Sequence, residues 1–323
     1  MTQSMTQKLL DLLGMEVPIV EGGMAYIGDG RLAAAVSNAG AFGQVGSAGR
    51  SLEDFERQIR LAIELTEGKK PFGINLPIGE HSDPRERVEM ILTYKDHIRA
   101  VSISAGNPRP FIPVFKEAGL TTMVAISTAM HAAKAEQAGA DILIAEGTEA
   151  GGHNGPAEVT TFALIPQVVS AVSVPVLAAG GIVDGRGLVA ALALGAAGVQ
   201  LGTRFVATQE SPAHEHYKQA IVAARGEDTT MIERSVGRVT RVLKSPYVEE
   251  VLGVEKTSPT ADELYPYIKG EKNRIGALEG DLAHGFAYSG QGCGLIDSIP
   301  TVQEVVFAMR QEARDTHHLL PKL

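Results

Sequence analysis

The residue best suited to proton transfer is a histidine inside a glycine-rich segment. His153 follows Gly151 and Gly152 and precedes Asn154 and Gly155, so no apolar neighbour in the sequence would pack it into a core. An imidazole can give or take a proton near neutral pH, which suits a general acid or base. Histidines in loops are more commonly just solvated, so the place of His153 in the fold must decide between the two interpretations.

Two further segments have the composition of a phosphate site. Gly180 and Gly181 end one apolar run, and Gly202 and Thr203 end the next. Glycine lets the backbone approach a ligand closely and direct its N–H groups at it. The phosphate of a cofactor or that of a substrate would satisfy this pattern equally. For any single glycine among the 36 in the chain, a tight turn is the plainer explanation.

The elements that must position these residues are short apolar runs that alternate with segments of helical spacing. Runs with apolar residues on both alternations are typical of parallel strands buried on both faces. We expect eight such strands, at Val17–Val20, Phe42–Val45, Phe72–Leu76, Ile98–Ser102, Thr122–Ile126, Asp141–Ala145, Val174–Ala179 and Gly198–Leu201.

This alternation predicts an α/β fold, a (β/α)8 TIM barrel, whose active site lies at the carboxyl ends of the strands. An open dinucleotide-binding sheet would require G-x-G-x-x-G after the first strand, where the chain has Glu21-Gly-Gly-Met24 instead. After the eighth strand the alternation stops. We therefore predict a barrel from residues 1–208 and 290–323, and a smaller, mostly helical insertion at 209–289.

The composition of the chain argues against several classes of protein and of site. The chain has 323 residues, a formal net charge of −9 and one cysteine, Cys293. The acidic balance argues against nucleic-acid binding, and a single cysteine cannot form an internal disulfide. We expect no membrane segment and, without a signal peptide, a cytoplasmic location. We also expect no metal site, because His214 and His216 lack the i, i+4 spacing of two ligands on one helix face.

Motifs along nearly the whole chain resemble those of the nitronate monooxygenase (2-nitropropane dioxygenase) family, which includes flavin-dependent enoyl-acyl-carrier-protein reductases of type II and some quinone reductases. The motifs, in family order, are Pro18-Ile-Val-Glu-Gly-Gly-Met24, Pro71-Phe-Gly-Ile-Asn-Leu76, Ala105-Gly-Asn-Pro108, Glu146-Gly-Thr-Glu-Ala-Gly-Gly-His153, Ala178-Ala-Gly-Gly-Ile182, Asp184-Gly-Arg-Gly187, Gly202-Thr-Arg-Phe205 and Ser289-Gly-Gln-Gly-Cys-Gly-Leu295.

The resemblance implies FMN at the mouth of the barrel and His153 as the catalytic residue. A homodimer would be consistent with the family, although no residue of this sequence requires one. Two positions depart from the family pattern: Glu21 replaces a usual glutamine and would put a carboxylate near the flavin, and Ala125 replaces the lysine of some quinone-reducing relatives. The implied cofactor-binding residues are Gly22, Gly23, Met24, Asn75, Glu146, Gly151, Gly152, Gly180, Gly181, Gly202 and Thr203.

The resemblance favours oxidation of alkyl nitronates with O2 to a carbonyl compound and nitrite. The alternatives are NAD(P)H-dependent reduction of an enoyl thioester on acyl carrier protein, NAD(P)H:quinone reduction, and a non-catalytic flavin- or phosphosugar-binding barrel. Each enzyme would act on a small molecule, and the reductases would need NADH or NADPH. An acidic carrier protein would require a basic rim, for which the candidates are Arg85, Arg87, Arg204, Lys218 and Arg225.

Overall fold

Eight parallel strands form a barrel in the computed structural model, which describes residues 3–79 and 83–321. The single parallel bridge between Val20 and Phe42 brings the first and last strands of the sheet together. The predicted TIM barrel is thereby confirmed, and each predicted run overlaps one strand. In spatial order the strands are β1 (Ile19–Glu21), β9 (Gly198–Leu201), β8 (Val176–Ala179), β6 (Ile142–Glu146), β5 (Thr121–Ile126), β4 (Ala100–Ser104), β3 (Phe72–Pro77) and β2 (Gly43–Gly46).

The barrel interior is a packed apolar core that is closed at its amino end. Strand residues such as Phe42, Met123 and Leu177 point inward and cluster with Leu9 and Leu13 of the first helix, α1 (Met5–Leu13). Side chains on the opposite face of each strand pack against the surrounding helices. Because the core fills the amino end, ligands have room only at the carboxyl ends of the strands.

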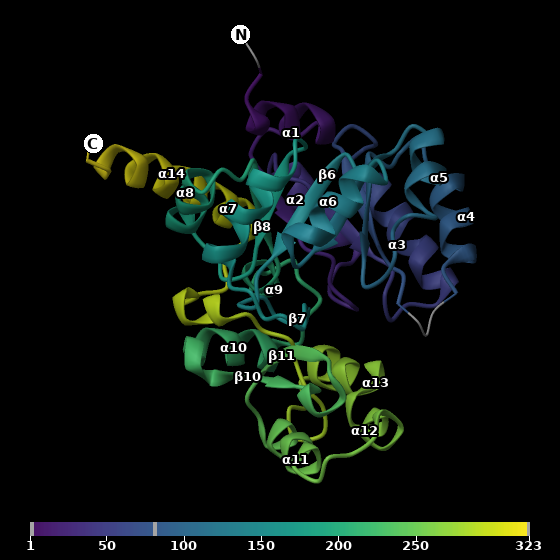
Figure 1. Cartoon of the computed structure of the whole chain (residues 1–323), viewed down its shortest axis with the longest axis vertical. Helices are drawn as coiled ribbons and strands as arrows, with labels where there is room; N and C mark the ends of the chain where they lie inside the picture. Colours follow the sequence, from purple (N-terminus) through teal and green to yellow (C-terminus); the bar gives the residue numbers. More distant parts are fainter. Residues whose placement is uncertain (1–2, 80–82, 322–323) are drawn as a thin grey trace.

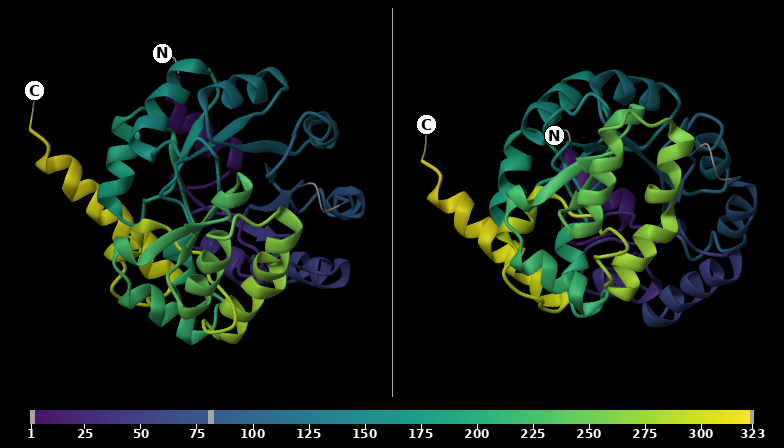
Figure 2. Two further views of the ribbon diagram at one scale, coloured as in Figure 1. Left: turned by 60° about the horizontal axis from the view of Figure 1, so that its bottom comes forward. Right: turned by 90° about the horizontal axis from the view of Figure 1, so that it is seen from below.

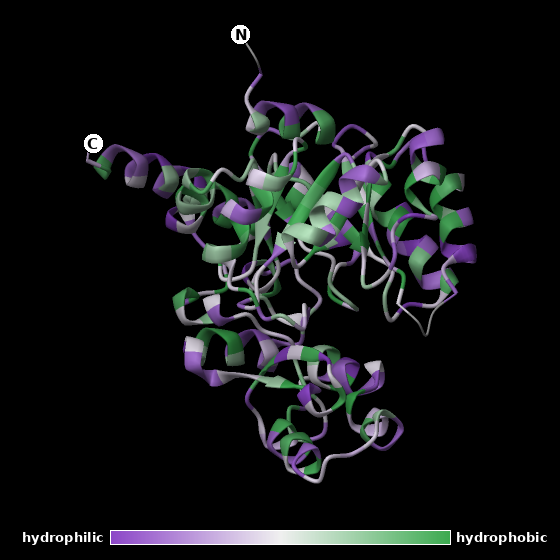
Figure 3. Ribbon diagram, in the orientation of Figure 1, coloured by the Kyte–Doolittle hydropathy of each residue, from purple (hydrophilic) through white to green (hydrophobic). Residues whose placement is uncertain are grey.

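Helices surround the barrel, as the alternation predicts (Figure 1). The last helix, α14 (Val302–Leu319), packs against α8 (Gly185–Ala193) and α2 (Gly30–Asn38) and so takes the place of an eighth outer helix. In Figure 3 the hydrophobic residues concentrate on the strands, and hydrophilic residues are frequent on the helices. The remaining barrel helices are α2 (Gly30–Asn38), α3 (Leu52–Leu65), α4 (Arg85–Thr93), α5 (Ile112–Glu117), α6 (Ala129–Gln137), α7 (Thr161–Ala171), α8 (Gly185–Ala193) and the short α9 (Thr203–Val206).

Residues 209–289, called the insertion below, lie across the carboxyl end of the barrel (Figures 1 and 2). They are mostly helical, as expected, but they also contain a β-hairpin that the sequence analysis does not predict, β10 (Thr229–Ile232) and β11 (Val239–Leu243). The third strand of this small sheet, β7 (Gly152–Asn154), comes from the barrel. The helices of the insertion are α10 (Glu215–Ala223), α11 (Pro246–Glu255), α12 (Ala261–Ile268) and α13 (Gly270–Arg274).

The insertion has its own small core. Ile232, Val242, Val248, Leu264 and Phe286 are buried together, apart from the barrel core. Within the part of the chain that the structure describes, no helix combines the length and apolarity that a bilayer crossing requires.

Candidate active site

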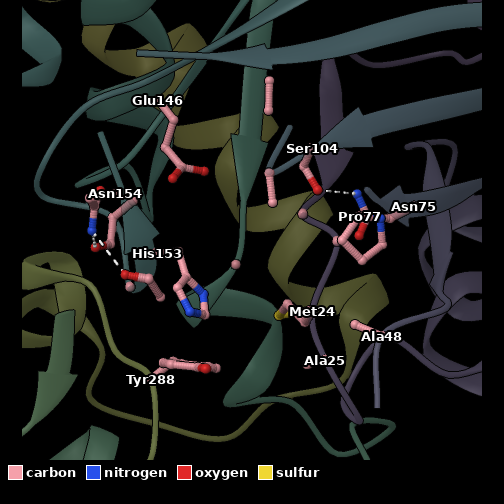
Figure 4. A pocket seen from close by; sticks show the side chains of 18 of the residues that line it. Met24, Ala25, Ala48, Asn75, Pro77, Ser104, Glu146, His153, Asn154 and Tyr288 are labelled. Atoms are coloured by element: carbon pink, nitrogen blue, oxygen red, sulfur yellow. Dashed lines mark hydrogen bonds between the residues drawn. The ribbon is translucent and has the colours of Figure 1, made fainter. Parts of the chain in front are cut away.

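A cavity of about 1810 Å³ lies between the carboxyl ends of the barrel strands and the insertion (Figure 4). All twelve residues named from the sequence as catalytic or cofactor-binding line it. They come from the carboxyl-terminal parts of β3 and β6 and from the segments that follow β1, β6, β8 and β9, because parallel strands bring their carboxyl ends to one side of a barrel. The geometry thus gathers residues that are up to 181 positions apart, from Gly22 to Thr203.

The glycine-rich loops after β8 and β9 form a backbone cradle. Gly180 has φ +97°, and a Cβ there would lie 2.7 Å from the Gly147 carbonyl oxygen, so only glycine fits. A third segment completes the cradle: Gly290 donates its N–H to Thr203 Oγ1 at 2.9 Å. Because this hydroxyl accepts there, its own proton stays available to an acceptor such as a phosphate oxygen. The surface is therefore suited to an anionic phosphate.

Gly290 and Gly292 line the cavity but are absent from our predicted site. The signal that could have found them is the glycine-rich motif Gly290-Gln-Gly-Cys-Gly294. Its contact with Thr203 depends on residues far apart in the sequence, which no local pattern reveals.

The opposite wall of the cavity is formed by the segments after β1 and β3. The Asn75 side chain is almost fully buried, and its Nδ2 donates to Ser102 Oγ at 3.0 Å. A Cβ at Gly23 would lie 2.1 Å from Asn75 Cγ, so the Gly23 backbone packs directly on this amide. Met24 extends beside them toward the centre of the cavity (Figure 4). This wall offers a fixed amide and a thioether, which suits one edge of a flat ring system.

Glu146 ends β6, and its carboxyl points into the cavity (Figure 4). Burial raises the pKa of this carboxyl to about 7, since no nearby cation compensates the loss of hydration. Near neutral pH the group can therefore either donate or accept a hydrogen bond.

His153 is held on a strand rather than on the loop that we expect from its glycine neighbours. It is the central residue of β7, which pairs antiparallel with β11 so that His153 faces Thr240 in the register. The ring of His153 lies 5.8 Å from that of Tyr288, centroid to centroid (Figure 4). Its side chain is 63 % exposed because it faces the cavity. A proton-transfer group is thus presented to a ligand from a braced backbone.

One expectation about a neighbouring position needs correction. Glu21 is fully buried but does not line the cavity, because its Oε2 turns to the backbone N–H of Gln44 on β2. Burial raises the pKa of Glu21 well above its usual value, so the neutral acid is favoured over the expected carboxylate. His131 of α6, which is absent from the predicted site, also lines the cavity.

A second cavity of about 390 Å³ adjoins the first, with Ala125 in the walls of both. Its ionisable lining residues are Arg109, His131 and Lys134. Neither the Arg109 guanidinium nor the Lys134 ammonium forms an ion pair with any residue that the structure describes. We call this cavity the cationic annex. It is a locally basic site in an acidic chain.

The rim of five cations considered for a carrier protein is not formed. Arg204 and Lys218 are buried, and Arg204 donates to the carbonyl oxygens of Ala207 and Ser298 at 2.6 and 2.8 Å. Arg85 pairs with Asp83 on the surface. Arg87 lines the main cavity. These side chains therefore do not compose one exposed basic surface.

Comparison with known proteins identifies relatives over almost the whole chain. The family model described as nitronate monooxygenase matches residues 6–312. Among solved structures, FabK from Thermotoga maritima is 38 % identical with a TM-score of 0.90, and the match covers 98 % of each chain.

Two curated relatives carry different names. A (3aS,4S,5R,7aS)-5-hydroxy-7a-methyl-1-oxo-octahydro-1H-indene-4-carboxyl-CoA dehydrogenase of Rhodococcus jostii is 34 % identical over 92 % of this chain and 93 % of its own length. A probable nitronate monooxygenase of Staphylococcus aureus is 30 % identical over 91 % and 93 %.

Proposed function

Because the chain belongs to the nitronate monooxygenase family, we propose that it is an FMN-dependent oxidoreductase that reduces the carbon–carbon double bond of an enoyl thioester with NADH or NADPH. The observation that carries this proposal is the size of the main cavity, about 1810 Å³. Sites for one small ligand usually measure about 300–1,000 Å³. The cavity therefore has room for FMN and for a second large ligand, which a small nitronate would leave mostly unfilled.

The residues around the cavity fit FMN. The cradle of Gly180, Gly290 and Thr203 would hold the phosphate, and Asn75 with Met24 would border the ring. The chemistry supplied by bound FMN is hydride transfer, from the nicotinamide to the β-carbon of the thioester. His153, which faces the same cavity, would deliver the proton that the α-carbon needs.

The cationic annex favours a phosphate-bearing thioester such as a coenzyme A ester. Arg109 and Lys134 would bind phosphate oxygens by charge-assisted hydrogen bonds. The names of the relatives support this choice, since FabK-like enoyl reductases and a carboxyl-CoA dehydrogenase are among them. A whole carrier protein is less well supported, because Arg204 and Lys218 are buried.

Nitronate oxidation, which the resemblance alone favours, is the second candidate. Its support is the family description and relatives such as the probable nitronate monooxygenase of Staphylococcus aureus. His153 could abstract the α-proton of a nitroalkane from the same position. Quinone reduction loses support because Ala125, and not a lysine, lines the cavity.

Anaerobic stopped-flow absorbance of the purified yellow protein tests the proposal. We expect NADH or NADPH to bleach the flavin, and crotonyl-CoA to restore its colour faster than crotonyl-acyl carrier protein does. The variant His153→Gln should bleach normally but reoxidise about 100-fold more slowly. Failure of both nucleotides to bleach the flavin, together with nitrite release from a nitronate in air, would establish the second candidate instead. A protein that cannot be loaded with FMN would refute both.

A further inference from the structure

A buried carboxylate stands behind His153. Glu233 Oε1 lies 4.0 Å from His153 Nε2, and the Glu233 side chain is only 4 % exposed. This distance is within ion-pair range, and contacts of catalytic groups often shorten when a ligand is bound. Glu233 is not a wall of the cavity, so it reaches a ligand only through the histidine.

The carboxylate of Glu233 is itself held from two sides. Thr240 Oγ1 donates to Glu233 Oε1 at 2.9 Å, and Arg238 Nε lies 3.2 Å from Oε2. Both partners belong to the strand β11 or to the turn before it. Arg238 and Tyr288 also line the cavity, and the Tyr288 ring lies 5.8 Å from that of His153. The position of the carboxyl is therefore set by the hairpin and not by chance rotation of a surface side chain.

The backbone at Glu233 supports a functional assignment. Its φ is +72°, a left-handed conformation that a residue with a Cβ rarely adopts. Such residues gather at functional sites, where the surrounding structure maintains the strain. The same hairpin fixes His153, because β11 pairs with β7 in the register that sets Thr240 opposite His153. Histidine and carboxylate are thus positioned by one piece of structure.

We propose that Glu233 is a positioning residue that orients the imidazole of His153 and determines which ring nitrogen faces the substrate. A hydrogen-bonding partner on one ring nitrogen determines the tautomer and the ring plane, and leaves the other nitrogen for chemistry. This inference rests on the proposed role of His153 as the proton donor. The insertion then contributes to catalysis through the strand it shares with the barrel.

The test compares Glu233→Gln with Glu233→Asp and with the control Glu158→Gln. Glu158 pairs with Arg234 of the same hairpin but does not contact His153. The first measurement is the NMR spectrum of flavin-loaded protein labelled with ¹⁵N-histidine, recorded at one pH. We expect the resonances of the His153 ring nitrogens to change in Glu233→Gln and to stay as in wild type in the control. The His153 signals are assigned by their loss in His153→Gln.

The kinetic readout should change in parallel. We expect kcat of Glu233→Gln to fall at least about tenfold with KM for the thioester unchanged, because misplacing a reacting group lowers the rate and not ground-state binding. Glu233→Asp should recover part of the loss. If Glu233→Gln does not fold, Thr240→Val removes the hydroxyl that holds Oε1 and should shift the same signals. Unchanged ring signals and unchanged kcat in the folded variants would overturn the proposal. If the His153 ring signals change in Glu233→Gln as expected but the wild-type protein reduces no thioester, the positioning role of Glu233 would stand and the proposed reaction would be refuted.

Discussion

The barrel and the insertion meet the same cavity in different ways. The barrel side presents mostly backbone, from loops whose glycines at Gly180, Gly181 and Gly202 leave no side chain between the chain and a ligand. On the insertion side, the β-hairpin orients a titratable side chain, His153, through strand pairing and the Glu233 carboxylate. The residues proposed for binding and for proton transfer are thus supported by two separately packed cores.

Glu146 is one barrel residue that does direct a side chain, a carboxyl, into the cavity. Its pKa is raised to about 7 by burial, so the folded protein binds this proton more tightly than the unfolded chain does. The free energy of unfolding should therefore decrease as the pH rises from about 4.5 to 7, by at most about 3 kcal/mol because the carboxyl borders a cavity that solvent can enter. Urea unfolding of Glu146→Gln should lack this decrease. An identical pH dependence in the variant would contradict the assignment.

Two left-handed glycines, one in each region, make the contrast measurable. Gly180→Ala forces a Cβ to within 2.7 Å of the Gly147 carbonyl oxygen, whereas Gly237→Ala, on the β10–β11 turn with φ +74°, meets nothing within 4 Å. We expect the second change to cost about 1 kcal/mol of unfolding free energy. The first should cost about 1–2 kcal/mol more and also weaken FMN binding at least about tenfold. The unfolding free energies of the two variants are compared by denaturant unfolding, and their FMN affinities by the fluorescence of released flavin. Equal effects of the two variants on FMN affinity would remove the distinction between the regions.

The cationic annex should give the smallest effect. Arg109→Ala and Lys134→Ala should each raise KM for a coenzyme A thioester about three- to tenfold at low salt, and less at high salt, because exposed charges are screened. Lys95→Ala is the matched control, since this exposed lysine precedes β4 at the amino end of the barrel. A KM that rises equally in the control would mean that only net charge matters.

The barrel could be predicted from the sequence because its signal is local. Runs such as Val176–Ala179 are apolar at every position and are buried on both faces, so composition and fold agree. The clustering of the candidate residues follows from the barrel, because the carboxyl ends of its parallel strands lie on one side. Strand β7, in contrast, is Gly-His-Asn, and it is a strand only because β11 pairs with it. The Glu233 contact depends on that pairing, so no pattern in the sequence could indicate it.

Helix α1 closes the amino end of the barrel, and this closure bears on the order in which the two substrates bind. Leu9 and Leu13 complete the apolar core at the amino end of the barrel, so ligands approach from the carboxyl ends of the strands. With FMN seated in the cradle, the electron donor and the electron acceptor would both have to approach from that end. The oxidised nucleotide would therefore depart before the thioester approaches, and the two half-reactions would take turns. In this way α1, at the opposite end of the barrel, would favour ping-pong kinetics without contacting either substrate.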